Sequence, residues 1–131
     1  MIYTTYFAKL KKLPETIIPI AICAKPPAGY NGAIYRTLAP KYNFFTKYKI
    51  TKDTVEFTEN YIGQVLNQLN PAKVVTELYY QLGLAPNTCD IALVCFEKSS
   101  DFCHRHLVAE WLSKAGYGCE EWNEYKTATG E

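Results

Sequence analysis

The segment that decides the fold is DIALVCFEKSSDFCHRHLVAEWLSKAG, residues 90–116. Its first part, Ile91 to Phe96, is an unbroken apolar run of the kind found in strands buried on both faces. Its last part has apolar residues at helical spacing before a typical helix stop at Gly116. These apolar residues are Leu107, Val108, Trp111 and Leu112. Because Ser99, Ser100 or Asp101 can cap a helix between the two parts, the segment predicts a strand followed by a helix.

The flanking sequence repeats this alternation of strands and helices. Further strands, rich in β-branched, aromatic or apolar residues, are expected at residues 2–7, 17–23 and 117–122. One helix is expected from Thr51, and a second is expected after the cap Asn70-Pro71 and before Gly83. The apolar face of the first helix is Val55, Ile62, Val65, Leu66 and Leu69, with Tyr61 beside it. The face of the second helix is Val74, Val75, Leu78 and Leu82.

Residues 28–50 interrupt the alternation, because they have no clear hydrophobic period. We expect a long loop with short helical turns there. The sequence as a whole predicts a single α/β domain over residues 1–131, with a mainly parallel sheet of about four strands and helices on both faces. The tail from about residue 123 is expected to be frayed.

The composition excludes several classes of protein. With 48% hydrophobic and 21% charged residues, the chain is globular rather than disordered. It contains no apolar run of membrane-spanning length, and its first residues lack the basic leader and apolar run of a secretion signal. The five cysteines are an odd number at irregular spacings, unlike a secreted disulfide scaffold. We therefore expect a cytoplasmic protein with reduced cysteines and no membrane partner.

The net charge of +1 conceals a strong asymmetry along the chain. Up to and including Lys52 there are nine Lys or Arg residues against one acid, Glu15. From Asp53 onward there are twelve acids against five basic residues. This division indicates either a basic surface for a phosphate-rich partner or two parts of one fold that pair across their boundary.

The turn between the strand and the helix of the opening segment gathers residues that carry chemistry. They are Cys95, Glu97, Cys103, His104 and Arg105. In parallel α/β sheets ligands bind outside the carboxyl ends of strands, and a helix start favours anions and thiolates. This position therefore predicts a functional site.

Four interpretations of this site remain open. In the one we favour, Arg105 and the helix start hold a phosphate, Glu97 is a general base, and His104 is an acid or an orienting group. Alternatively, Cys103 is a nucleophile with a lowered pKa, although adjacent helical residues diverge by about 100° and need not touch. In a third, purely structural interpretation, His104 is a core histidine. Arg105 then pairs with Glu97 and clamps the loop to the helix.

The fourth interpretation is a zinc site made by Cys95, Cys103 and His104, with Cys23 or His106 as a fourth ligand. It lacks the paired C-x-x-C spacing that is typical of structural zinc sites. The sequence therefore leads us to predict neither a metal nor an organic cofactor.

Residues 94–112, VCFEKSSDFCHRHLVAEWL, resemble the signature of the domain-of-unknown-function 488 family. The opening IYTTYFAKLKKLP (residues 2–14), the PP-x-x-Y-x-G stretch and YRTLAPK (residues 35–41) resemble the short single-domain branch of that family. The resemblance implies a compact α/β domain without a settled activity, and its shared polar positions fall on the five residues of the turn. Where family members commonly have an arginine and a tryptophan before the two prolines, this chain has Ala24 and Lys25, and a lysine offers a point charge instead of a bidentate fork.

Aromatic and basic residues interleave between Lys25 and Lys52, as in surfaces that stack bases and follow phosphates and also in the rim of an ordinary core. We predict that this segment forms one wall of a pocket whose other wall is residues 95–105. The catalytic candidates are Glu97, Cys103 and His104, and the ligand-binding candidates are Arg105, Lys25, Tyr30 and Cys95. The expected ligand is a phosphate-bearing small molecule or a nucleic acid. The alternative is a non-catalytic module that binds nucleic acid or another partner.

Overall fold

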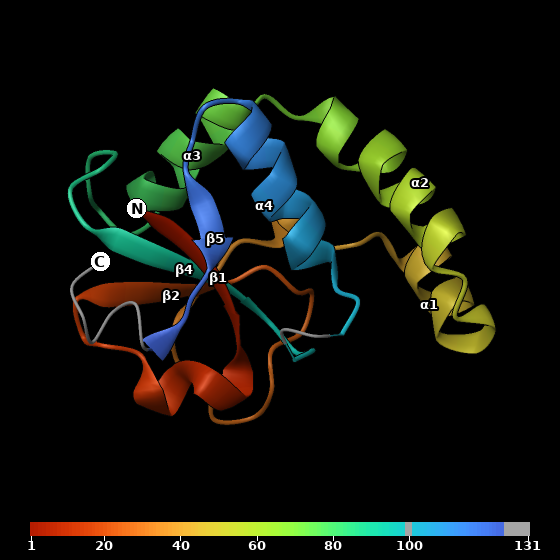
Figure 1. The fold of residues 1–131 in the computed structure, drawn as a ribbon, viewed down its shortest axis with the longest axis horizontal. Helices are drawn as coiled ribbons and strands as arrows, with labels where there is room; N and C mark the ends of the chain where they lie inside the picture. The colour runs from red at the N-terminus through yellow and green to blue at the C-terminus, as the bar shows by residue number, and fades with distance from the viewer. Residues whose placement is uncertain (99–100, 125–131) are drawn as a thin grey trace.

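Five parallel strands form the central sheet within the described part of the chain (Figure 1). The computed structural model describes residues 1–98 and 101–124. In spatial order the strands are β3 (Ala33–Ile34), β2 (Ile17–Ala21), β4 (Asp90–Cys95), β1 (Ile2–Tyr6) and β5 (Cys119–Glu121). The predicted α/β class and parallel sheet are confirmed, with five strands instead of about four. The strand that the sequence analysis missed is β3, a two-residue edge strand in the segment expected to be a loop.

Four α-helices and three short 3-10 helices connect the strands in the described residues. The α-helices are α1 (Tyr42–Thr51), α2 (Thr54–Gln64), α3 (Pro71–Tyr80) and α4 (His104–Lys114). The 3-10 helices are η1 (Phe7–Lys12), η2 (Arg36–Leu38) and η3 (Leu66–Gln68). The expected start of α3 is confirmed, because the Asn70 side chain accepts a hydrogen bond from the Lys73 N–H at 3.2 Å. Its expected stop is also confirmed, because Gly83 follows α3 with a φ of 73°, which favours glycine.

Helix α1 differs from the prediction, whereas the helix expected from Thr51 is confirmed as α2, with Tyr61, Val65 and Leu66 buried as expected. Helix α1 occupies a segment that was expected to be a loop, and among its residues only Phe44 is fully buried, so it has little hydrophobic period. In α2 the buried residues are Phe57 and Tyr61, whereas Val55 is 65% exposed. The Phe44 and Phe57 rings are 5.2 Å apart, edge to face. Aromatic contacts between the two helices, which a count of aliphatic residues does not detect, therefore determine the buried face.

The first residues of α4 also differ from the prediction. Its N-cap is Cys103, which has extended backbone angles and makes no side-chain capping bond, and not Asp101. Ser99 and Ser100, the other two expected caps, lie outside the described residues, as do residues 125–131 of the expected frayed tail. Glu124, the last described residue, forms an ion pair with Lys9 at 2.8 Å.

The connections of the sheet place the α-helices on one face and η1 on the other (Figure 1). The chain passes from β1 over β4 to β2 through η1, and from β4 over β1 to β5 through α4. Because such crossovers are right-handed, connections that run in opposite directions lie on opposite faces. The packing on the two faces of the sheet is consistent with this arrangement. Leu93 belongs to the cluster that contains buried residues of the α-helices, whereas its neighbour Ala92 packs with Leu13 beside η1. Within residues 1–98 and 101–124, none of the helices has the length and hydrophobicity that a membrane span needs.

The strand order creates a switch point between β2 and β4. These strands are neighbours, but β2 continues outward to β3 while β4 continues in the other direction to β5. In open α/β sheets such a divergence opens a crevice outside the carboxyl ends of the two strands, and ligands bind there. The topology therefore favours a site between the segments that follow Ala21 and Cys95.

Candidate ligand-binding pocket

A pocket of about 410 Å³ lies at this switch point. Cys23 to Lys25, which follow β2, form one side of it, and Cys95 to Glu97, which follow β4, form another. Phe102 to His104 at the start of α4, residues of α1, Pro40 before α1 and Phe57 of α2 complete the lining. The predicted convergence of the two segments on one pocket is therefore present in the structure. The residues that meet there come from parts of the chain up to about 80 positions apart, so the fold and not local sequence brings them together.

Aromatic rings from three elements line the pocket. Tyr48 of α1, Phe57 of α2 and Phe102 before α4 contact one another, with ring centroids 5.0 to 5.6 Å apart. Phe45 and Phe96 also line the pocket, and Phe96 is 49% exposed. Rings that are packed against each other and still reach the pocket form a rigid, apolar wall, which suits a flat ligand.

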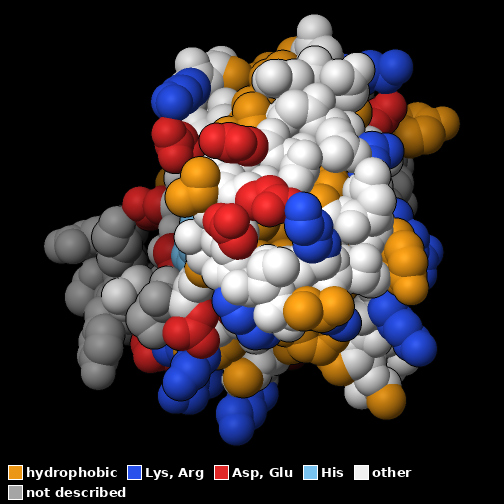
Figure 2. Space-filling view, turned by 90° about the vertical axis from the view of Figure 1, so that its right-hand side faces the viewer, with side chains coloured by type: hydrophobic (Ala, Val, Ile, Leu, Met, Phe, Trp, Pro, Cys, Tyr) orange, Lys and Arg blue, Asp and Glu red, His pale blue; other side chains and the backbone are white. Residues whose placement is uncertain are grey.

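Two exposed lysines, Lys25 and Lys49, stand at the pocket. The Lys49 Nζ lies 4.8 Å from the centre of the Phe45 ring. Among residues 1–98 and 101–124, neither lysine forms an ion pair with a carboxylate. Figure 2 shows that Lys and Arg side chains on the α1–α2 side of the molecule lie mainly in the lower half, and acidic side chains mostly above them. The pocket lining therefore holds two lysines without an ion-pair partner among the described residues, together with one acid, Glu97.

Arg105 occupies a different place from the one predicted. It is fully buried, and its Nε and Nη2 donate to the Glu121 carboxylate at 3.1 and 3.0 Å. Its Nη1 donates to the Glu97 carbonyl oxygen at 2.5 Å and to Cys95 Sγ at 3.2 Å, and the guanidinium lies over the Tyr6 ring. The prediction that Arg105 binds an anion does not fit this position. The clamp between loop and helix is present, but it is made to the Glu97 carbonyl and not to its carboxylate.

His104 is buried, and its ring is fixed by the backbone. The Nε2 atom lies 2.8 Å from the Ile22 carbonyl oxygen, which can only accept a hydrogen bond, so Nε2 carries the proton. The Nδ1 atom, which therefore has a free lone pair, lies 3.7 Å from Cys103 Sγ. Burial lowers the pKa of His104 to about 4, although the Ile22 hydrogen bond opposes this shift. The imidazole is therefore neutral at pH 7, which suits an orienting group better than a proton donor.

The contact between Cys103 and His104 follows from the position of the helix start. The divergence of about 100° applies to two residues that are both helical. Cys103 is instead the N-cap, with φ of −154° and ψ of 146°, so its side chain can lie beside the imidazole. A cap at residues 99–101, which the sequence predicts, would make Cys103 helical and would not give this contact.

The prediction of reduced cysteines is wrong for Cys95 and Cys103, which form a disulfide. The end of β4 lies against the start of α4, so two sulfurs that are eight positions apart in the sequence meet. Cys23, Cys89 and Cys119 are free, as expected. Cys23 packs in the same cluster as the disulfide and lines the pocket, and burial raises the pKa of its thiol. With the disulfide formed, Cys103 has no thiolate to act as a nucleophile.

The remaining predicted residues separate into two groups. Glu97 is exposed and lines the pocket together with Lys25 and Cys95. Tyr30 lines a different hollow, where its hydroxyl donates to the Ala33 carbonyl oxygen at 2.6 Å. Burial raises the pKa of Tyr30 to about 12, so it is a neutral hydrogen-bond donor. Two residues of this region were not predicted. Phe102 lines the pocket, and Glu121 is the partner of Arg105 only because the pairing of β5 with β1 brings it near.

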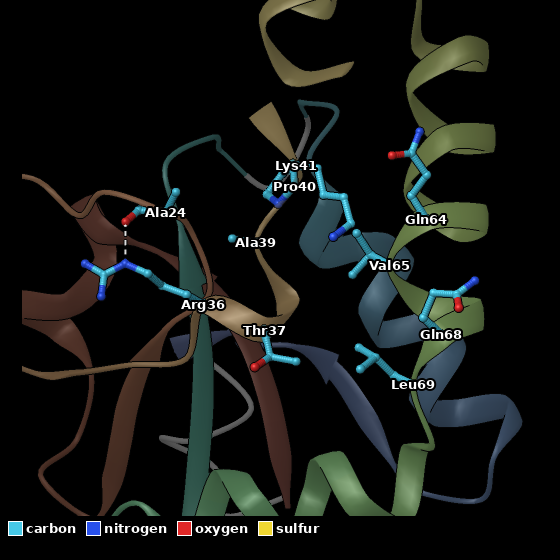
Figure 3. A pocket seen from close by; sticks show the side chains of 10 residues that line it. All are labelled: Ala24, Arg36, Thr37, Ala39, Pro40, Lys41, Gln64, Val65, Gln68 and Leu69. Atoms are coloured by element: carbon cyan, nitrogen blue, oxygen red, sulfur yellow. Dashed lines mark hydrogen bonds between the residues drawn. The ribbon is translucent and has the colours of Figure 1, made fainter. Parts of the chain in front are cut away.

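A second pocket of about 410 Å³ adjoins the first, and Ala24 and Pro40 line both (Figure 3). Two basic residues, Arg36 and Lys41, contribute to it. The Arg36 Nε donates to the Ala24 carbonyl oxygen at 2.8 Å, and the Lys41 side chain extends toward Val65 (Figure 3). The positive charge at the first pocket is therefore continued on the other side of Pro40.

Residues 3–116 match a family model described as the active DUF488-N3 subclade. The matched range includes Cys103, His104 and Arg105 and both segments that line the pocket. No curated protein and no solved structure matches the chain.

Proposed function

Because this chain belongs to the DUF488 family, with a match to its active DUF488-N3 subclade, we propose that the pocket at the switch point is an enzyme-like site for a nucleotide or a nucleotide unit of a nucleic acid. The observation that carries the proposal is the combination of an aromatic wall with lysines that lack acidic partners among the described residues. Rings stack on bases and lysines attract phosphates. The description of the matched subclade as active supports a catalytic pocket over a purely structural one.

The phosphate end of the ligand belongs near Lys25, Lys49 and the first turn of α4. Cys103 caps α4 without a side-chain bond, so the backbone N–H groups of this turn lack a side-chain acceptor at the cap. A helix start with such groups attracts anions, and here it lines the same pocket as the two lysines. Three sources of positive potential around one pocket outweigh the single lining carboxylate, Glu97, and so favour a ligand with several negative charges.

The proposed roles differ among the predicted catalytic residues. Glu97 is the acid of the pocket lining and is the proposed acceptor of a proton from the reacting group. His104 is a positioning residue, because its hydrogen bond to the Ile22 carbonyl oxygen holds the backbone that leads to Cys23 in the pocket lining. Arg105 is a positioning residue, since its Nη1 donates to the Glu97 carbonyl and its other nitrogens are bound by Glu121.

We expect the double variant Lys25→Ala/Lys49→Ala to bind adenosine triphosphate about 100-fold more weakly than the wild type, because each lost charged hydrogen bond costs about 1.5 kcal/mol or more. Isothermal titration at fixed salt measures the change. Lys73→Ala is the matched control, because Lys73 is an exposed lysine of α3 that does not line the pocket. Equal affinity of the double variant and the wild type would contradict a nucleotide site here. Glu97→Gln should retain binding and lose turnover.

A second candidate function, non-catalytic binding of single-stranded nucleic acid, is favoured by the adjoining pocket with Arg36 and Lys41. In that case an oligonucleotide should bind more tightly than adenosine triphosphate, with an affinity that falls steeply with salt. The double variant Arg36→Ala/Lys41→Ala should bind the oligonucleotide more weakly and should bind adenosine triphosphate with unchanged affinity. Binding of the oligonucleotide that does not depend on salt would exclude this function.

A further inference from the structure

We propose that the reduced form of this chain binds a zinc ion through Cys95 Sγ, Cys103 Sγ and His104 Nδ1, with a fourth coordination position open to the pocket. The donor atoms of these three residues all lie within 4.8 Å of one another. The residue spacing alone favours a phosphate site over zinc, and it is the geometry that brings these donors together. The inference does not depend on the binding of nucleotides.

The separations between donors suit a tetrahedral ion. Zinc bonds of about 2.3 Å to sulfur and about 2.0 to 2.1 Å to nitrogen place neighbouring donors about 3.6 to 3.8 Å apart. The Cys103 Sγ and His104 Nδ1 atoms are already 3.7 Å apart. Once the disulfide is reduced, the two sulfurs must separate to a similar distance. This requires a movement within the turn that follows β4, while the imidazole stays in place.

The imidazole is oriented as a metal ligand. Its Nε2 donates to the Ile22 carbonyl oxygen at 2.8 Å, which leaves the Nδ1 lone pair directed toward Cys103. In protein metal sites the ligating histidine almost always donates its other N–H to a carbonyl or carboxylate, because this fixes the tautomer and the ring. The corresponding partner of Cys95 is Arg105, whose Nη1 lies 3.2 Å from the sulfur and would moderate the charge of a thiolate.

The chemical nature of the donors selects the metal. Two thiolates and an imidazole are soft or intermediate donors, which favour Zn²⁺ over Mg²⁺ or Ca²⁺. All three ligands are buried and all three line the pocket. Zinc sites with three protein ligands and one open position are typical of catalysis, since the fourth position takes water or substrate. Glu97 lines the same pocket, so it is available to hold or move a proton of that water.

Binding requires reduction of the disulfide first. A dithiol transfers two electrons and two protons to the Cys95–Cys103 bond, which gives two thiols, and the dithiol becomes a cyclic disulfide. The zinc ion then replaces the two thiol protons, which are released to solvent. The same residues thus exist as a disulfide under oxidising conditions and as a metal site under reducing conditions.

The test uses the full chain, reduced with a dithiol and freed of it without oxygen, then titrated with zinc chloride. Elemental analysis after gel filtration should give one zinc per chain for reduced protein and none for protein with the disulfide intact. Zinc should release about two protons per ion and protect Cys95 and Cys103 from alkylation. Titration with Co²⁺ should produce the near-ultraviolet band of cobalt bound to thiolate.

Variants assign the ligands. Cys103→Ser and His104→Ala should each weaken zinc binding by more than about 100-fold, since loss of even an outer-shell partner costs 10- to 100-fold. Cys89→Ser is the matched control, because Cys89 is a free cysteine outside the pocket lining, and it should bind zinc like the wild type. The proposal would be overturned if reduced wild-type protein retained no zinc after the titration, or if Cys103→Ser bound zinc as tightly as the wild type. The proton release and alkylation of the wild type decide the result even if a variant fails to fold.

Discussion

Replacement of Arg105 by methionine is expected to lower the free energy of unfolding by about 3 to 5 kcal/mol. Arg105 is fully buried, and the Glu121 carboxylate that it binds at two positions is 24% exposed. Methionine fills part of the same volume, but it leaves Cys95 Sγ and the Glu97 carbonyl without this donor. It also takes the charge of Arg105 from the Glu121 carboxylate, which accepts a further hydrogen bond from the Thr4 hydroxyl. The loss should appear as a lower midpoint in urea denaturation at pH 7.

Three further variants make this result specific to the buried pair. Lys114→Met breaks a pair with Glu110 in which both side chains are well exposed, so it should change the midpoint very little. Arg105→Lys keeps the charge without the planar fork and should give an intermediate loss. Arg105→Met combined with Glu121→Gln should be less destabilising than Arg105→Met alone, because no unpaired charge is left. A wild-type midpoint for Arg105→Met would show that the clamp does not stabilise the fold.

Acidification is expected to destabilise the metal-free, disulfide-containing protein through His104. The pKa of His104 is about 4 in the folded chain, against 6.5 for the solvated histidine of an unfolded chain. As the pH falls below 6.5, the unfolded state takes up the proton first, so the contribution of neutral His104 to stability is full above pH 6.5 and is lost progressively toward pH 4. At 1.36 kcal/mol per pKa unit the loss is about 3 kcal/mol. Burial is the main cause, and the positive charges of Arg105 and His106 act in the same direction.

Urea denaturation at several pH values between 7 and 4 measures this loss, with a chelator present. The carboxylates of the protein also titrate in this range, so the informative quantity is the difference between the wild type and His104→Gln. Glutamine keeps a polar side chain at this position but does not titrate, and its stability should fall less steeply with pH. Identical pH dependence in the two proteins would mean that His104 is solvated, contrary to its 7% exposure.

The parts of the fold that could be predicted from the sequence are those with a local pattern. The strand at residues 90–95 has an unbroken apolar run, the helix at residues 104–114 has apolar residues at helical spacing, and the start of α3 has the cap Asn70 followed by proline. Helix α1 could not be predicted in this way, because only Phe44 is fully buried and the partly buried hydrophobic residues Phe45 and Tyr48 are aromatic and not aliphatic. Its packing depends on Phe57, which is 13 positions away.

The location of the candidate site could also be predicted, because parallel strands bring their carboxyl ends to one edge. The roles of single residues could not. Arg105 was expected to face a ligand, but it meets Glu121 once β5 pairs with β1. The disulfide and the contact between Cys103 and His104 depend on which residue begins α4, and a shift of two positions in the cap changes both.

The shortness of the two outer strands has a consequence for the solution behaviour of the protein. A strand at the border of a sheet exposes backbone groups to which another molecule can add a strand, the first step toward aggregation. Here β3 has two residues and β5 has three, so an incoming chain finds only a brief template on either side. The long, strongly hydrophobic strand β4 lies in the interior of the sheet, between β2 and β1. The order of the strands thus keeps β4, the most aggregation-prone strand, from pairing with other molecules.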